Sequence, residues 1–145
     1  MTDAGIPAPD ETAVFGAIGR LEGTEDVSGK RVLSAADEQA VASLPAGSAL
    51  LIVQRGPSAG ARFLLDTDRI TAGRHPRSDI FLDDVTVSRK HCEFLRSDGG
   101  YLVRDIGSLN GTYVDRIRVE SHLLAAGEEV QIGKFRLAYY PAVAQ

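Results

Sequence analysis

The sequence has little of several residue types, and each shortage excludes a class of protein. Cys92 is the single cysteine among 145 residues, so an internal disulfide is impossible, which fits a reducing compartment. No apolar run is long enough to span a bilayer, and the first ten residues lack the basic and apolar segments of a secretion signal. The net charge of -4 gives no reason to expect nucleic acid or an anionic membrane as a partner. We therefore expect a soluble, cytoplasmic protein.

The sequence also lacks the usual signatures of a metal site or a catalytic centre. The three histidines and Cys92 do not have the spacing of zinc ligands, so we expect no metal and no cofactor. The segment 56–60, Gly-Pro-Ser-Ala-Gly, matches the nucleophile elbow of hydrolases in its letters. That chemistry needs a strand, a sharp turn and a helix, but here a strand pattern follows the serine. We interpret the segment as a hairpin loop and expect no enzymatic activity.

Charge divides the chain into two parts near Gly47. Residues 1–47 carry eight acids and three bases, a charge of -5, and residues 48–145 carry twelve acids and thirteen bases, a charge of +1. The first part has Phe15 as its single aromatic residue and is too poor in apolar side chains to offset the entropy lost on ordering. We predict a flexible, acidic N-terminal tail over residues 1–47 and a folded domain over residues 48–145. Within the tail, Ser34 to Asp37 resembles a capping box that would start a short helix.

From Ser48 onward the sequence has the pattern of an all-β protein. Short apolar or alternating runs follow one another, separated by turn clusters such as Ser-Asp-Gly-Gly at 97–100, and no helical period intervenes. This pattern predicts a β-sandwich. The predicted strands are 49–53, 62–65, 69–72, 80–82, 91–96, 101–104, 112–114, 129–132 and 135–140.

Polar residues suited to holding a phosphate are concentrated in three predicted loops. Arg74 and Arg89 offer planar guanidinium groups, Ser88 and Ser108 offer hydroxyl donors, and Asn110 offers an amide that could grip a peptide backbone. No general base stands beside a nucleophile, so the set indicates anion binding without turnover. The loops are 73–75, 88–91 and 107–112.

The order and spacing of these blocks resemble the forkhead-associated (FHA) domain. The blocks are Gly73-Arg74, Ser88-Arg89-Lys90-His91 and Asn110-Gly111-Thr112. The resemblance implies an eleven-stranded β-sandwich that binds phosphothreonine peptides and selects the residue three positions after the phosphothreonine. It implies that Arg74 and Ser88 contact the phosphate, that Arg89 lines the same pocket, and that Asn110 holds the peptide backbone.

The same resemblance assigns the remaining loop residues. Leu109 stands where many relatives have a hydroxyl residue, and Ser108 is expected to replace that phosphate contact. The family pattern gives architectural roles to Gly73, His91, Gly111 and Thr112, with His91 tying the loops together.

Longer stretches resemble the GarA/OdhI family of actinobacterial regulators, which have one FHA domain behind a disordered tail. These stretches are residues 48–51, 73–76, 78–89, 107–114 and 130–137. In that family a Ser/Thr protein kinase phosphorylates a tail threonine, and the tail then occupies its own FHA site. The open form binds 2-oxoglutarate dehydrogenase and, in some members, glutamate dehydrogenase and glutamate synthase.

The resemblance points to Thr12 as the phosphoacceptor, with Phe15 as its third following residue. Relatives have two adjacent threonines here, but in this chain Glu11 replaces the first. Thr24, followed by Val27, is a second candidate acceptor. Two hypotheses stay open: a monomeric, self-inhibited regulator of metabolic enzymes, and a phosphopeptide adaptor that recruits phosphorylated kinases or other proteins without self-inhibition.

Overall fold

The computed structural model describes residues 33–143. The chain divides into two units between Gln39 and Ala40, within the helix α1 (Ala35–Ala42). The backbone N–H of Asp37 donates to Ser34 Oγ at 3.1 Å, so the predicted cap at the start of this helix is confirmed. No helix in the described part of the chain is both long and apolar enough to cross a membrane.

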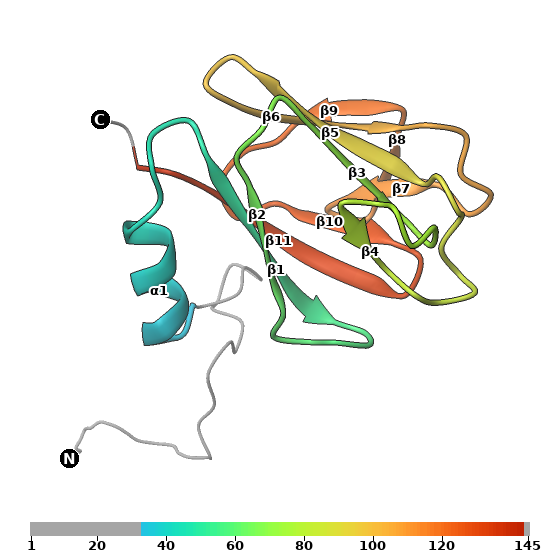
Figure 1. The fold of residues 1–145 in the computed structure, drawn as a ribbon, viewed down its shortest axis with the longest axis horizontal. Helices are drawn as coiled ribbons and strands as arrows, with labels where there is room; N and C mark the ends of the chain where they lie inside the picture. Colours follow the sequence, from blue (N-terminus) through green and yellow to red (C-terminus); the bar gives the residue numbers. More distant parts are fainter. Residues whose placement is uncertain (1–32, 144–145) are drawn as a thin grey trace. The chain divides into compact units, whose positions relative to one another are not determined.

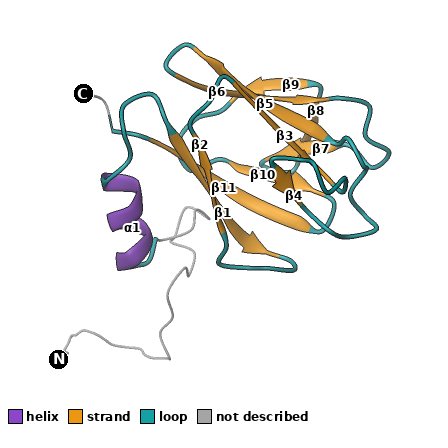
Figure 2. Ribbon diagram, viewed as in Figure 1, coloured by secondary structure: helices purple, strands orange, loops and turns teal. Residues whose placement is uncertain are grey.

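The strands form two sheets that face each other, as Figures 1 and 2 show. The first sheet has six strands in the order β2-β1-β11-β10-β7-β8, and the second has five in the order β4-β3-β5-β6-β9. The first sheet contains β1 (Ala49–Arg55), β2 (Arg62–Leu65), β7 (Thr112–Val114), β8 (Ile117–Val119), β10 (Glu129–Ile132) and β11 (Phe135–Pro141). The second contains β3 (Arg69–Gly73), β4 (Ile80–Phe81), β5 (Cys92–Ser97), β6 (Gly100–Asp105) and β9 (Ser121–Leu123). The expected all-β sandwich of eleven strands is confirmed.

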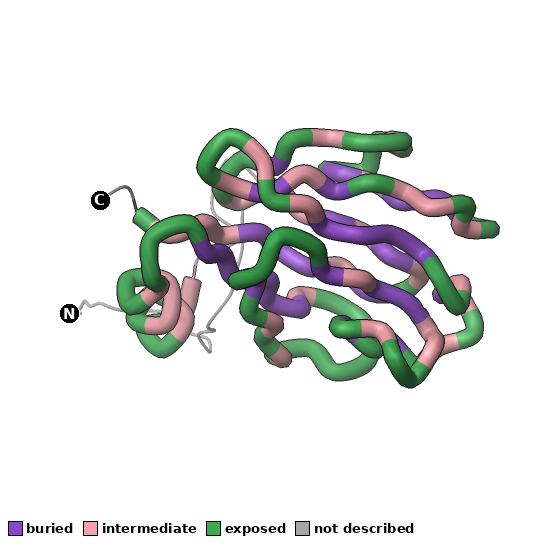
Figure 3. Tube along the Cα trace, turned by 45° about the horizontal axis from the view of Figure 1, so that its top comes forward, coloured by how far each residue is buried: buried purple, intermediate pink, exposed green. Residues whose placement is uncertain are grey.

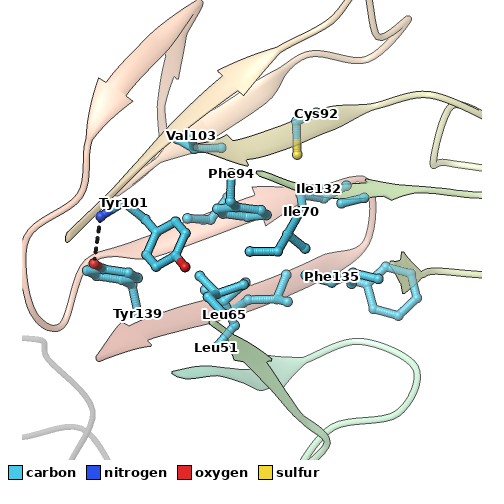
Figure 4. Close-up of a cluster of buried hydrophobic side chains, with 14 of the residues drawn as sticks. Leu51, Leu65, Ile70, Cys92, Phe94, Tyr101, Val103, Ile132, Phe135 and Tyr139 are labelled. Carbon is cyan, nitrogen blue, oxygen red and sulfur yellow. Dashed lines mark hydrogen bonds between the residues drawn. The ribbon is translucent and has the colours of Figure 1, made fainter. Parts of the chain in front are cut away.

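The core lies between the two sheets and draws side chains from both. Leu51 and Ile132 come from the six-stranded sheet, and Phe94 and Val103 come from the five-stranded sheet. Figure 3 shows the buried positions along the strands, and Figure 4 shows how these side chains meet. Alternate residues of strands such as β10 are buried, because successive side chains of a strand point to opposite faces.

Polar groups within this core are satisfied by hydrogen bonds. The hydroxyl of the buried Tyr139 accepts the backbone N–H of Tyr101 at 3.0 Å, drawn as a dashed line in Figure 4. The hydroxyl of Tyr101 donates to the carbonyl of Thr67 at 2.6 Å. Burial raises the pKa of the Cys92 thiol well above its ordinary value, so this thiol is an inert part of the core.

The predicted strands all exist, but two strands of the structure were not predicted from the residue pattern. The missed strands, β8 and β9, have three residues each. The segment 56–60 joins β1 to β2, so it lies in a hairpin and has no helix after it. The nucleophile-elbow geometry is therefore absent at Ser58.

The strand pairing brings three loops to one end of the sandwich. Ala72 pairs with Cys92, and Cys92 pairs with Asp105, so the end of β3, the start of β5 and the end of β6 lie together. The β3–β4, β4–β5 and β6–β7 loops leave the sandwich from this end. These loops contain all three polar segments that the sequence singles out.

Candidate functional site

The β3–β4 and β4–β5 loops are held together through their backbones. Arg74 N–H donates to the carbonyl of Ser88 at 2.9 Å, and His75 N–H donates to the carbonyl of Arg89 at 3.3 Å. Gly73 is buried at this contact, and a Cβ there would overlap the Arg89 carbonyl oxygen and lie 3.1 Å from that of Ser88. Only glycine allows the two loops to approach this closely.

His91 connects the β4–β5 loop to the β6–β7 loop. Its imidazole is fully buried. Nδ1 accepts the backbone N–H of Ser88 at 3.1 Å, and Nε2 lies 2.9 Å from the carbonyl of Gly111. An acceptor Nδ1 and a donor Nε2–H define the neutral ring in a single tautomer. Burial lowers the pKa of His91, although the Gly111 hydrogen bond and the charge of Asp105 act in the opposite direction.

Asp105 organises the β6–β7 loop from the end of β6. Its carboxylate accepts the backbone N–H groups of Gly107 and Ser108, at 3.0 and 3.2 Å, and the hydroxyls of Ser108 and Thr112. Burial raises the pKa of Asp105, but these four hydrogen bonds outweigh that effect and hold the pKa below its ordinary value. Ser108 Oγ also accepts the N–H of Gly111 at 2.9 Å, so its hydroxyl group is used within the loop.

Three side chains at this end keep donors that no described residue uses. Arg74 donates Nε–H to the carbonyl of Val87 at 3.0 Å, which orients the guanidinium group and leaves both of its Nη groups free. Ser88 Oγ accepts the N–H of Leu109 at 2.9 Å, and its hydroxyl proton has no acceptor among residues 33–143. The side chain of Arg89 is exposed and forms no hydrogen bond or ion pair within the same range. These donors come from adjoining loops and suit an oxyanion with several acceptor oxygens.

The structure adds Thr86 to the residues expected from sequence. Its carbonyl accepts Asn110 Nδ2–H at 2.9 Å, and its Oγ1 accepts Lys134 N–H at 2.9 Å. Its hydroxyl and its N–H both donate to Asp84 Oδ2. Thr86 therefore fixes the Asn110 amide so that Oδ1 remains available as an acceptor. Two sequence patterns could have indicated these supporting residues. Asp84-Val85-Thr86 and Asp105-Ile106-Gly107-Ser108 both have the form of a turn that an aspartate side chain closes.

The predicted binding residues are brought to one end of the sandwich. Arg74 lies in the β3–β4 loop, Ser88 and Arg89 in the β4–β5 loop, and Ser108 and Asn110 in the β6–β7 loop. Ser88 and the β6–β7 loop are in direct contact through Leu109 N–H. The two candidate phosphoacceptors, Thr12 and Thr24, and also Phe15 lie outside the described residues.

Comparisons with known proteins agree with this geometry. The model of the FHA domain matches residues 70–133, a range that contains all three loops. An oxoglutarate dehydrogenase inhibitor from Corynebacterium efficiens is 54% identical over 142 residues, which are 96% of this chain and 96% of that protein. The chain belongs to the FHA domain family. The glycogen accumulation regulator GarA from Mycolicibacterium smegmatis is 66% identical over 99 residues, or 68% of this chain and 63% of that protein.

Solved FHA domains have the same fold. One comes from a structural and functional analysis of phosphothreonine-dependent FHA domain interactions. It superimposes with a TM-score of 0.60 at 29% identity and covers 66% of this chain and 98% of its own. The three site loops of this chain lie within the range that the FHA domain model matches. The match to the C. efficiens inhibitor covers 96% of the chain, so it also includes most of the N-terminal part.

Proposed function

We propose that this FHA protein binds phosphothreonine at the end of its sandwich and regulates metabolic enzymes. The observation that carries the proposal is the set of unused donors on Arg74, Ser88 and Arg89. Arg74 supplies two Nη groups whose direction is set by the bond to Val87. Ser88 supplies a hydroxyl proton, and Arg89 supplies a second guanidinium group at the exposed edge. Charge-assisted hydrogen bonds from such donors are among the strongest available to a phosphate.

The other site residues hold the peptide or shape the loops. Asn110 presents Oδ1 to a peptide N–H while Thr86 fixes its Nδ2. The hydroxyl of Ser108 already donates a hydrogen bond to Asp105. We therefore assign Ser108 to shaping the β6–β7 loop and not to the phosphate contact. Gly73 and His91 hold the loops in register, and Gly111 and Thr112 anchor the start of β7. No residue in this arrangement serves as a nucleophile with a base beside it, which supports a binding protein without catalytic activity.

The names of the relatives support a metabolic client. The C. efficiens relative is an oxoglutarate dehydrogenase inhibitor, and its similarity spans nearly the whole of both chains. We infer that the unphosphorylated protein acts in the cytoplasm as a monomer on 2-oxoglutarate dehydrogenase and on enzymes of the glutamate dehydrogenase type.

Regulation by a Ser/Thr protein kinase completes the proposal. Phosphorylation of Thr12, or of Thr24 as the second candidate, creates a phosphothreonine on the same chain as the site. A tethered ligand is present at an effective concentration on the order of millimolar, so it would nearly fill a site of micromolar affinity. The protein's own tail then covers the FHA loops and releases the client.

The test is an inhibition assay with purified 2-oxoglutarate dehydrogenase. The unphosphorylated full-length protein should inhibit the enzyme, and phosphorylation at Thr12 should relieve inhibition. The control is Ser88→Ala. Its phosphorylated and unphosphorylated forms should inhibit the enzyme equally, because its phosphorylated tail should no longer bind the FHA site. Equal inhibition by the Thr12-phosphorylated and unphosphorylated proteins would refute the tail switch. If the protein instead leaves the enzyme untouched and captures phosphorylated kinases, the adaptor function replaces this proposal.

A further inference from the structure

A cavity adjoins the β3–β4 and β4–β5 loops, which we propose bind the phosphate. Its volume is about 330 Å³, within the range of ligand-binding pockets. The polar residues that line it are Arg69, Thr71, His75, Arg77, Ser78 and Lys90. His75 directly follows Arg74, and Lys90 directly follows Arg89, so the cavity lies one residue further along both loops that supply phosphate donors.

The lining of this cavity is cationic. Arg69, Arg77 and Lys90 line it, and no carboxylate does. Arg69 is paired with the buried Glu93 at 2.6 Å. In contrast, Arg77 and Lys90 are exposed and have no ion pair with any residue in the range 33–143. The cavity therefore offers two unneutralised positive charges.

Two acids that contact residues of the lining, Glu93 and Asp79, are already engaged. Glu93 also pairs with Arg104, and although burial raises the pKa of Glu93, the two arginines hold the pKa below its ordinary value. Asp79 accepts the N–H of Thr71 at 2.9 Å and the hydroxyl of Thr71 at 3.2 Å. Neither carboxylate is placed to neutralise Arg77 or Lys90, so the positive charge is open to a ligand.

We propose that this cavity is a subsite for acidic side chains directly before the phosphothreonine, and that Asp10 and Glu11 occupy it when Thr12 is phosphorylated. The inference rests on the proposed function and adds a sequence preference to it. Charge on the two sides of Thr12 is unequal: Asp10 and Glu11 precede it, and the stretch from Ala13 to Gly19 has no charged residue. Only the preceding side can complement a cationic cavity.

The spacing is consistent with this placement. An extended chain advances about 3.3–3.6 Å per residue, so the two acids reach roughly 7 Å from the phosphothreonine. The cavity begins one residue beyond the phosphate donors on each loop. A peptide whose phosphate meets Arg74 and Arg89 therefore has its preceding acids within reach of His75 and Lys90.

The experiment is a double-mutant cycle measured by fluorescence anisotropy. The probe is a labelled phosphothreonine peptide with the sequence of residues 5–18, and its partner peptide carries Asp10→Asn and Glu11→Gln. The proteins are full-length chains that all carry Thr12→Ala, so that no tail competes. Three such proteins are compared. The first has no other change, the second (the double variant) carries Arg77→Gln and Lys90→Gln, and the third carries Arg55→Gln. Arg55 is an exposed arginine at the end of β1, in the other sheet, and its substitution controls for the loss of a positive charge outside the cavity.

The acidic peptide should bind the double variant roughly 3- to 10-fold more weakly than the protein with an intact cavity, as expected for two exposed ion pairs. The neutral peptide should bind both proteins with the same, weaker affinity, and Arg55→Gln should change neither value. Equal affinity of the two peptides for the intact cavity would overturn the subsite, and so would an equal loss for both peptides in the double variant. If neither phosphopeptide binds at all, the proposed function itself fails.

Discussion

The two serines of the site loops should respond to substitution in opposite ways. Ser88→Ala removes a hydroxyl whose proton has no acceptor among the described residues and which we assign to the phosphate. The same substitution removes the acceptor of Leu109 N–H, but Leu109 is exposed, so water can replace that bond. Ser108→Ala removes a hydroxyl that donates to Asp105 and accepts Gly111 N–H. The first substitution therefore acts on binding, and the second acts on the stability of the loop.

The magnitudes follow from the contacts. Loss of a hydrogen bond to a charged phosphate costs about 1.5–3 kcal/mol, which corresponds to a roughly 10- to 140-fold weaker affinity. Ser108→Ala leaves the N–H of the buried Gly111 without its acceptor, at a cost of about 1–3 kcal/mol in unfolding free energy. In a domain of this size, each kcal/mol lowers Tm by about 4–8 °C.

The assay combines calorimetric titration of a Thr12 phosphopeptide with thermal unfolding of the same proteins. Full-length Ser88→Ala should lose affinity while its Tm changes little, and full-length Ser108→Ala should lose Tm and retain most of its affinity at a temperature where it is folded. A folded Ser88→Ala protein that binds as tightly as the unchanged protein would refute the assignment of the phosphate site. The reverse pattern, with affinity lost only in Ser108→Ala, would show that Ser108 is the phosphate donor.

Two further predictions concern the connections between the loops. Gly73→Ala should force the Arg89 carbonyl away and break the hydrogen bond between Arg74 and Ser88. It should lower the unfolding free energy by about 1–3 kcal/mol and also weaken phosphopeptide binding. The control is Gly60→Ala, where a Cβ meets no atom within 4 Å but φ is +96°, so it should lose stability and keep its affinity for the phosphopeptide. A Gly73→Ala protein with unchanged affinity would contradict the close-contact argument. Because the folded protein keeps His91 neutral, with a pKa below the 6.5 of the free side chain, the unfolded state takes up its proton first as the pH falls. The contribution of His91 to the unfolding free energy should therefore be constant above pH 6.5 and should decrease as the pH falls below 6.5. The slope should be smaller in His91→Gln, and an equal slope in both proteins would contradict this account.

The turns show why part of the fold could be predicted and part could not. The β5–β6 hairpin has a two-residue loop, Asp98-Gly99, with positive φ at both residues, and Asp-Gly is a strong sequence signal for that turn. The β7–β8 hairpin has the same geometry at Asp115-Arg116, with φ of 47° and 70°. Arginine seldom adopts positive φ, so nothing in the sequence marked this turn, and β8 was missed together with the short β9 beyond it.

The sequence pattern brought out the polar residues of the site loops and some of their supporting residues, but not all of the supports. Arg74, Ser88 and Asn110 stand in loops with glycine and hydroxyl neighbours, which is a visible pattern. Thr86 contacts Asn110 and Lys134, which lie 24 and 48 positions away, and a linear sequence does not show such contacts. Asp105 was missed although its partners lie only 2 to 7 positions away. The hydroxyl of Ser108 was expected at the phosphate but donates to Asp105, three positions earlier, because the pattern of residues alone does not say which acceptor a hydroxyl takes.

The most direct test of the central claim is an NMR amide spectrum of the full-length protein before and after treatment with a Ser/Thr kinase, with Thr12→Ala as the control. If the phosphorylated tail occupies its own site, the amides of Arg74, Ser88 and Leu109 will shift in the treated protein and stay unchanged in Thr12→Ala. The shifted protein will also no longer bind an added phosphothreonine peptide. Complete phosphorylation of Thr12 with these amides unmoved, and with the added peptide still bound, would contradict the switch.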